Sequence, residues 1–185
     1  MPDHLTIEQR HKNMAAIHSK DTKPEMIVRR YLWSHGFRYR LNHPRLPGRP
    51  DIVLRKYRTC IFVNGCFWHG HGVLWDENED ERSLVSSNCC KIPRTNREFW
   101  VQKILRNRER DSEVEQKLAE MGWYSITIWE CQLKDRKTLQ PGEKSTRERT
   151  LESLAYTLNH LYLENHRVKH FSPQEDDGQL MAAEE

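Results

Sequence analysis

The sequence predicts an α/β or α+β fold in which helices cover a mixed sheet. Two observations predict it: segments with helical periodicity alternate with short β-rich runs, and capping residues separate them. The 185 residues are enough for one domain with a tail. The expected elements are helices at 7–19 and 23–35, strands at 51–54 and 59–63, a helix between Thr95 and Gly122, a strand at 123–129, and a last helix from Ser145 or Thr146.

Capping residues mark where the predicted helices begin. Thr22-Lys23-Pro24-Glu25 supplies a capping hydroxyl, a proline in the first turn and a glutamate at the third helical position, and Gly36 ends the apolar repeat. Thr95-Asn96-Arg97-Glu98 predicts a similar capping box for the next helix. Between these helices, the runs 51–54 and 59–63 are joined by a short polar connection, which favours a hairpin.

Charge is distributed unevenly along the chain. Residues 1–60 hold 13 Lys or Arg against 5 Asp or Glu, and residues 94–110 hold 6 against 2. Residues 76–82 are strongly acidic, and residues 171–185 contain acids but neither Lys nor Arg. Two basic regions favour a polyanionic partner such as nucleic acid, and the alternative is a solvated charged surface.

Composition excludes several classes of protein. No stretch approaches the roughly 20 apolar residues of a membrane span, and the N-terminus lacks the apolar region of a secretion signal. A cytoplasmic protein without membrane contact is therefore expected. In that reducing compartment the five cysteines suit a metal site better than disulfides.

Pro50-Asp51 opens the first predicted strand. A carboxylate at the start of a buried strand needs a hydrogen-bond donor or a cation. Metal-dependent nucleases often place an aspartate there and Glu-x-Lys on the neighbouring strand, but this neighbouring strand ends in Phe62-Val63-Asn64. The backbone carbonyl of Val63 would then complete a site for Mg²⁺, which prefers oxygen ligands. The alternative is an aspartate at a turn–strand junction without a metal.

Cys66-Phe67-Trp68-His69-Gly70-His71 directly follows the second strand. Thiol and imidazole groups suit structural zinc, which takes four ligands. Cys66, His71 and Cys131, together with either Cys89 or Cys90, would supply them. The alternative is that the cysteines are small buried residues, which is the interpretation adopted for Cys60.

The same segment contains a candidate proton carrier and candidate DNA contacts. His69 lies on a glycine-flanked loop, and histidine titrates near neutral pH, so it could activate water or protonate a leaving oxygen. The alternative is a solvated loop histidine. Phe67, Trp68 and Trp100 lie among basic residues, where aromatic side chains can insert between base pairs or stack on bases, although they are more often part of a core.

Seven motifs follow one another between about residues 10 and 135. They are Lys12-Asn13-Met14, Asp21-Thr22-x-x-Glu25, Leu46-Pro47-Gly48-Arg49-Pro50-Asp51, Gly65-Cys66-Phe67-Trp68-His69-x-His71, Phe99-Trp100-x-x-Lys103-Ile104-x-x-Asn107-x-x-Arg110-Asp111, Gly122-Trp123 and Ile128-Trp129-Glu130-Cys131. Together they resemble the very short patch repair (Vsr) family of DNA mismatch endonucleases. The resemblance implies a restriction-endonuclease-like fold with a structural zinc site. It also implies Mg²⁺-dependent cleavage of one strand on the 5′ side of the T in a T·G mismatch, which arises by deamination of 5-methylcytosine.

The resemblance also assigns roles position by position. Asp51 and the carbonyl of Val63 would bind Mg²⁺, and His69 would be the general acid or base. Glu25 would support the water around the metal, in addition to capping its helix. Three zinc ligands would be Cys66, His71 and Cys131, and the DNA contacts would be Met14, Phe67, Trp68, Trp100, Lys103 and Asn107. The expected partner is double-stranded DNA with a T·G mismatch, bound by a nucleoid-associated monomer that also contacts other mismatch-repair proteins.

The sequence departs from the family pattern at three places. Asn64 stands where the family often has histidine, so catalysis would depend more strongly on His69. Gly72-Val73 stands where the second zinc cysteine is usual, so Cys90, or alternatively Cys89, would have to fold back. The chain also continues about 50 residues beyond Cys131. The predicted segments are a DNA-contacting helix at 1–20, an endonuclease core at 21–135, a helical extension at 136–165 and an acidic tail at 166–185 that is expected to be disordered.

Two other functions compete with mismatch repair. The first is a Vsr-like nuclease of restriction or phage defence that cuts other DNA. The second is a zinc-stapled DNA-binding module that does not cleave. Asp51 and His69 argue against the second, because neither a zinc site nor an aromatic wedge requires them.

Overall fold

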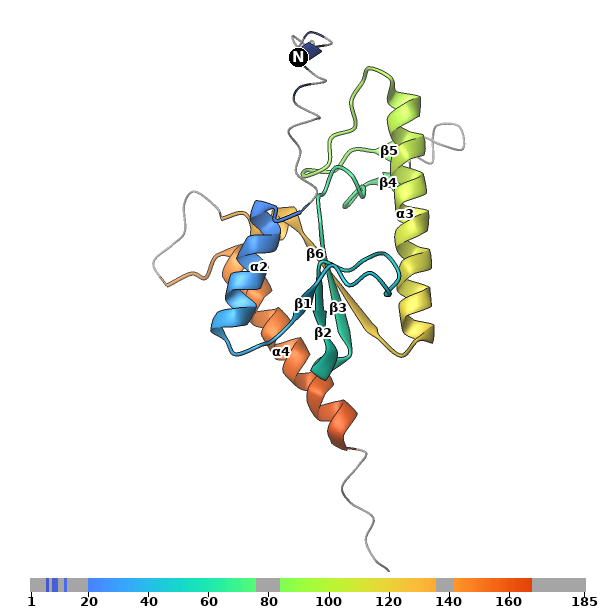
Figure 1. The fold of residues 1–185 in the computed structure, drawn as a ribbon. Coiled ribbons are helices and arrows are strands. Elements are labelled where there is room, and N and C mark those ends of the chain that lie inside the picture. The colour runs from blue at the N-terminus through green and yellow to red at the C-terminus, as the bar shows by residue number, and fades with distance from the viewer. Residues whose placement is uncertain are drawn as a thin grey trace, which may run out of the picture.

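The centre of the fold is a four-stranded mixed sheet with the strand order β1-β2-β3-β6 (Figure 1). The computed structural model describes residues 6, 8, 9, 12, 20–75, 84–135 and 142–167. The strands of the sheet are β1 Arg40–Leu41, β2 Ile52–Leu54, β3 Thr59–Asn64 and β6 Tyr124–Trp129. The first three are antiparallel, and β6 runs parallel to β3. The predicted α/β fold with a mixed sheet is confirmed.

Three long helices cover the two faces of this sheet. They are α2 Lys23–Ser34, α3 Arg97–Glu120 and α4 Thr146–Arg167. Helices α2 and α4 lie together on one side, and α3 lies on the other, where it connects β3 to the parallel strand β6 (Figure 1). Parallel strands need such a crossover, usually a helix, because a tight turn cannot join them.

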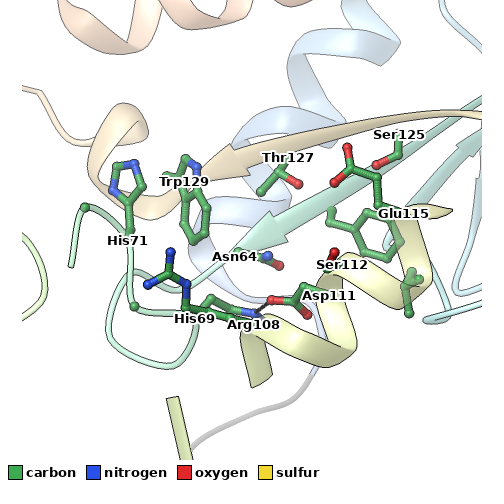
Figure 2. Close-up of a pocket in the computed structure, with 14 residues that line it drawn as sticks. Asn64, His69, His71, Arg108, Asp111, Ser112, Glu115, Ser125, Thr127 and Trp129 are labelled. Atoms are coloured by element: carbon green, nitrogen blue, oxygen red, sulfur yellow. Dashed lines mark hydrogen bonds and ion pairs between the residues drawn. The ribbon is translucent and has the colours of Figure 1, made fainter. Parts of the chain in front are cut away.

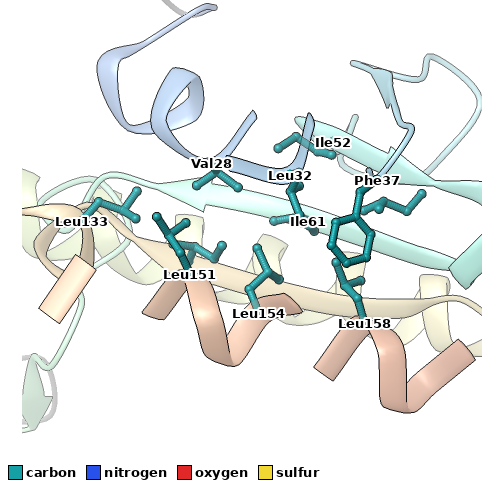
Figure 3. Packing of buried hydrophobic residues seen from close by; sticks show 11 residues of the cluster. Val28, Leu32, Phe37, Ile52, Ile61, Leu133, Leu151, Leu154 and Leu158 are labelled. Carbon is teal, nitrogen blue, oxygen red and sulfur yellow. The ribbon is translucent and has the colours of Figure 1, made fainter. Parts of the chain in front are cut away.

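Alternation along the strands divides the core between the two faces. Ile52 and Ile61 belong to the cluster that packs against α2 and α4 (Figure 3), whereas Val53 and Cys60 pack towards α3 with Leu118. Helix α4 contributes Leu151, Leu154 and Leu158 to the first cluster. This cluster also contains Val28, Leu32, Phe37, Leu54, Ile128 and Leu133. The C-terminal helix therefore shares its core with the sheet. Cys60 is fully buried, as predicted.

Short elements complete the described structure. They are the 3₁₀ helices η1 Arg55–Tyr57 and η2 Glu130–Leu133, and a separate two-stranded sheet of β4 Leu74–Trp75 and β5 Leu84–Val85. A second hydrophobic cluster fixes the segment after β3 against the start of α3, and contains Val73, Leu84, Cys90, Ile92, Val101 and Ile104.

In the described part of the chain, no helix has the length and apolar character needed to cross a membrane.

Of the three long helices, α2 and α4 begin with the caps that the sequence predicts, and α3 does not. The hydroxyl of Thr22 accepts the Glu25 N–H, and Ser145 and Glu148 form a reciprocal capping box before α4. The box predicted at Thr95 is wrong, because α3 begins after Asn96, whose backbone is left-handed and whose side chain makes no cap bond. The helix predicted at 7–19 lies largely outside the described residues.

Candidate active site and metal centre

A cleft of about 730 Å³ opens where β3 ends. Predicted site residues from three parts of the chain line it: Glu25 on α2, Asp51 before β2, and Val63 and His69 on and after β3. The fold brings them together because β2 and β3 are neighbours and α2 packs on the same sheet. This cleft is the candidate active site.

Asp51 and Val63 form a compact pair of oxygen donors. The Asp51 carboxylate accepts the Val63 backbone N–H at 2.8 Å. The N–H and C=O of one strand residue face the same neighbour, so the Val63 carbonyl is directed to the same side. Burial raises the pKa of Asp51, and the nearby charge of Glu25 raises it further, while the Val63 N–H and His69 oppose this shift. Two hard oxygen donors, one of them a desolvated carboxylate, fit a divalent cation such as Mg²⁺.

Glu25 serves the helix start and also faces the cleft. Its side chain is buried, with one carboxylate oxygen accepting the Thr22 hydroxyl at 2.8 Å and the other accepting the Asp21 N–H at 3.1 Å. The predicted capping role is confirmed. The same carboxylate lies close enough to Asp51 to raise its pKa, so a second role in the cleft stays a prediction.

His69 is held by a residue that sequence reasoning left without a role. The Nδ1 of His69 lies 2.5 Å from a carboxylate oxygen of Asp111 on α3. A carboxylate at Nδ1 fixes the imidazole tautomer and leaves Nε2 for proton transfer. Asp111 belongs to a motif noted above, but 42 residues separate it from His69, and only the fold reveals the pair.

The His69–Asp111 pair lies between two cavities. Besides the cleft, both residues line a second cavity of about 300 Å³ between α3 and β6, drawn in Figure 2. Ser125 and Thr127 on β6 form its other side. Asn64 also lines both cavities, together with the His69–Asp111 pair.

Three cysteines and a histidine form a cluster suited to a metal ion. They are Cys66, His71, Cys89 and Cys131, and their ligand atoms all lie within 4.8 Å of one another. The Nδ1 of His71 is 3.2, 3.4 and 3.9 Å from the sulfurs of Cys89, Cys131 and Cys66, respectively. A tetrahedral ion with ligand distances of about 2.0–2.3 Å, as zinc has, produces similar separations between ligands.

Burial and the neighbouring sulfurs shift the pKa values of residues in this cluster. Burial raises the pKa of the Cys131 thiol to about 12, and the neighbouring Cys66 and Cys89 sulfurs add to this effect. Burial also lowers the pKa of His71, which favours the neutral imidazole that a metal requires. A bound cation would favour the thiolate forms, because a coordinating thiol is deprotonated.

The structure selects Cys89, not Cys90, as the fourth member of this cluster, so the preference for Cys90 was wrong. The Ser87 hydroxyl donates to the His71 carbonyl at 2.6 Å and accepts the Cys90 N–H at 3.0 Å. This turn directs Cys89 to the cluster. Cys90 is fully buried in the second hydrophobic cluster, and its thiol donates to the carbonyl of Phe67 at 3.7 Å.

The predicted aromatic residues lie together beside the cleft. Phe67 lies with its ring centroid 5.1 Å from Trp68 and 5.0 Å from Trp100, and all three are half-buried. Phe99, which belongs to a motif noted above but was given no role there, extends the group and is 60% exposed.

Three further predicted DNA contacts differ in their surroundings. The Asn107 side-chain amide donates to the Trp68 carbonyl at 2.7 Å, so it supports the aromatic loop from α3. Lys103 is exposed one turn earlier on the same helix. Met14 lies outside the described residues.

Comparisons with known proteins identify the family of this chain. A family model described as "DNA mismatch endonuclease Vsr" matches residues 2–74. "Type II nicking enzyme V.NmeAIP" of Neisseria meningitidis serogroup A / serotype 4A (strain DSM 15465 / Z2491) is 45% identical over 136 residues, which cover 74% of this chain and 87% of the relative. "Type II nicking enzyme V.XorIIP" of Xanthomonas oryzae pv. oryzae (strain KACC10331 / KXO85) is 40% identical over 143 residues, covering 76% and 93%.

A third relative carries the family's own name. "DNA mismatch endonuclease Vsr" of Escherichia coli (strain K12) is 39% identical over 130 residues, which cover 70% of this chain and 74% of the relative. The mixed sheet, the cleft and these relatives define the class of the protein, which is a DNA endonuclease. Within that class, the chain belongs to the Vsr family of DNA mismatch endonucleases, and the resemblance stated from the sequence is confirmed.

Proposed function

We propose that this chain nicks one DNA strand on the 5′ side of the T in a T·G mismatch by Mg²⁺-dependent hydrolysis. The observation that carries the proposal is one cleft in which the Asp51–Val63 pair meets His69, beside the Phe67–Trp68 aromatic group. The name of the Escherichia coli relative supports mismatched DNA as the substrate.

The metal sites would contribute in different ways. Asp51 and the Val63 carbonyl would hold Mg²⁺, which supplies positive charge to the scissile phosphate as negative charge develops there. Cys66, His71, Cys89 and Cys131 would hold structural Zn²⁺. Because His69 lies between two of these ligands in the sequence, the cluster fixes the loop that carries the proton-transferring residue.

Protein side chains would carry the proton transfer. The Nε2 of His69 takes a proton from the attacking water while the water oxygen bonds to phosphorus. The bond from phosphorus to the leaving oxygen breaks, and that oxygen takes a proton from solvent. Asp111 accepts the Nδ1–H and stabilises the imidazolium that forms, and Glu25 orients water in the cleft.

The aromatic group would insert into the duplex most readily where base stacking is weak. Insertion of Phe67, Trp68 and Trp100 unstacks bases, which costs a few kcal/mol per step and less at a mismatch. Lys103 would add a cation that binds DNA, Asn107 would hold the Trp68 backbone in place, and Met14 would contact DNA from the N-terminal segment. One active site suffices for one nick, so we propose that a monomer acts and that it also contacts other mismatch-repair proteins.

A second function is favoured by the names of two relatives. Both are type II nicking enzymes, which favours a nicking activity linked to restriction, with a different DNA specificity. Substrate preference separates this function from mismatch repair, because both functions require the same hydrolytic site.

Cleavage of end-labelled duplexes tests both functions. One duplex contains a single T·G mismatch and its control contains T·A, each incubated in Mg²⁺ and in EDTA with the wild type, Asp51→Ala and His69→Ala. We expect a Mg²⁺-dependent nick 5′ of the mismatched T that both substitutions abolish. Equal cutting of both duplexes would support the restriction-linked nickase. Binding without cutting, in several sequence contexts, would instead support a zinc-stapled binding module.

A further inference from the structure

Arg49 has a strained backbone at the edge of the catalytic cleft. Its φ angle is +50°, and that of the preceding Gly48 is +70°. A side chain at positive φ crowds the following carbonyl, so only glycine adopts this region freely. Arg49 also precedes Pro50, and a residue before proline is pushed towards an extended conformation. The sequence therefore retains an arginine where glycine would be less strained.

Other residues with positive φ have a clear reason for it. Asp21, Asn42 and Asn96 are short polar types that tolerate the left-handed region. Arg58 uses its guanidinium to cap α3, donating to the carbonyls of Gly122 at 2.9 Å and Met121 at 3.2 Å. In the part of the chain that the structure describes, no corresponding contact accounts for Arg49.

Packing holds this loop rigidly against α3. A Cβ atom added at Gly48 would lie 2.5 Å from a methyl carbon of Val114, so the loop backbone approaches the helix as closely as glycine permits. Leu46, two residues earlier, is buried in the cluster beneath the same helix. The backbone of Arg49 is therefore held in one position by packing, as a preorganised charge requires.

The guanidinium of Arg49 is available to a ligand. Arg49 is exposed and lines the cleft together with Asp51 and His69. Glu25, Asp111 and Glu130 also line this cleft, yet the described residues give the Arg49 side chain no hydrogen bond or ion pair. An unpaired guanidinium beside several carboxylates indicates that its partner is an anion outside the chain.

We propose that Arg49 binds the phosphate at the scissile bond and stabilises the negative charge that develops on it during hydrolysis. This assignment rests on the proposed nuclease function. The neighbouring strand offers no lysine near Asp51, since β3 ends in Val63-Asn64, so Arg49 supplies the fixed positive charge. Its planar fork can donate two parallel hydrogen bonds to a phosphate, and such bonds gain strength as the charge grows.

Variants at position 49 separate this role from a structural one. Single-turnover nicking of the T·G duplex is measured at saturating enzyme, with DNA affinity measured by fluorescence anisotropy in Ca²⁺ in place of Mg²⁺. We expect Arg49→Ala and Arg49→Gly to lower the rate about 100-fold or more while the Kd changes less than about tenfold. Arg49→Lys should recover part of the rate, because it restores the charge but not the fork.

Thermal unfolding of the same variants provides the independent readout. Arg49→Gly should melt at a higher temperature than Arg49→Ala, because glycine adopts the left-handed conformation without strain. Arg45→Ala, an exposed arginine of the same loop that does not line the cleft, is the matched control, and its rate should stay within about threefold of the wild type.

Each contrary result has a distinct meaning. Rates of the Arg49 variants within threefold of a cutting wild type would overturn the assignment of Arg49. An equal rate loss in Arg45→Ala would also overturn it, because the effect would then be general electrostatics. If the wild type fails to cut any duplex, the proposed function itself is wrong, and the role of Arg49 falls with it.

Discussion

The imidazole Nδ1 of His69 lies 2.5 Å from the carboxylate of Asp111, across the gap between the loop after β3 and helix α3. The contact joins the two sides of the cleft and determines which ring nitrogen remains available for chemistry. Both residues also line each of the two cavities, and Figure 2 shows them in the smaller one. The orientation of the His69 imidazole therefore depends on a helix residue far from it in the sequence.

Replacing Asp111 should impair catalysis without preventing DNA binding. Asp111→Asn retains the shape of the side chain but removes the charge that orients the imidazole and stabilises its protonated form. We expect the single-turnover nicking rate to fall about 10²–10³-fold, within the range of general acid–base contributions. Glu115→Gln is the matched control, since Glu115 lies one turn further along α3 and lines only the second cavity. A similar loss in both variants would contradict a specific role for Asp111.

The two adjacent cysteines should behave differently towards metal. Cys89→Ala removes a ligand from the cluster, so the bound Zn²⁺ measured after dialysis should fall well below one ion per chain. Cys90→Ala should retain the ion and lower the free energy of unfolding by about 1 kcal/mol, because it opens a small cavity in the core. Chelators should destabilise Cys90→Ala and the wild type but not Cys89→Ala. Retention of a full metal complement in Cys89→Ala would show that another residue is the fourth ligand.

Asp51 is expected to reduce stability in the metal-free protein. Burial raises its pKa above the ordinary value of 3.8, with the charge of Glu25 adding to the effect. The folded chain therefore binds the carboxyl proton of Asp51 more tightly than the unfolded chain does. Ionisation of Asp51 lowers the free energy of unfolding fully above the folded pKa, and it has no effect below the unfolded pKa.

This cost can be measured by neutralising the side chain. Asp51→Asn keeps an oxygen for the Val63 N–H, and we expect it to raise the melting temperature in EDTA at pH 7. The difference should shrink as the pH falls below the raised folded pKa, and it should close only below the unfolded value of 3.8, where the wild-type carboxyl is protonated in both states. Mg²⁺ should raise the melting temperature of the wild type alone. A lower melting temperature for Asp51→Asn at pH 7 would mean that the carboxylate is stabilised by contacts other than a cation.

Local sequence patterns account for most of the fold. Capping at Thr22, the stop at Gly36 and the β-rich runs around Ile52 and Ile61 are decided by residues near one another, so their elements were predictable. The two-residue strands β1, β4 and β5 were not predictable, because pairing with a neighbour rather than intrinsic preference creates them.

Contacts in the candidate site were likewise predictable only where they follow from local sequence patterns. Asp51 and Val63 face each other because their strands form a hairpin, and this contact could be anticipated. Asp111 could not, since its partner is reached only through the packing of α3. Cys89 and Cys90 are adjacent and chemically identical, and only the turn held by Ser87 decides which one reaches His71.

Helix α4 provides a test of whether the C-terminal extension stabilises the whole domain. Leu158 is fully buried in the cluster that contains Leu32 and Ile61, so Leu158→Ala should lower the free energy of unfolding by about 2–5 kcal/mol. Leu163, on the same helix, is 57% exposed, and Leu163→Ala should change stability by less than about 0.5 kcal/mol. Urea unfolding followed by the fluorescence of the tryptophans outside α4 reports on the rest of the domain. If that signal is unaffected by Leu158→Ala, α4 unfolds separately and does not support the sheet.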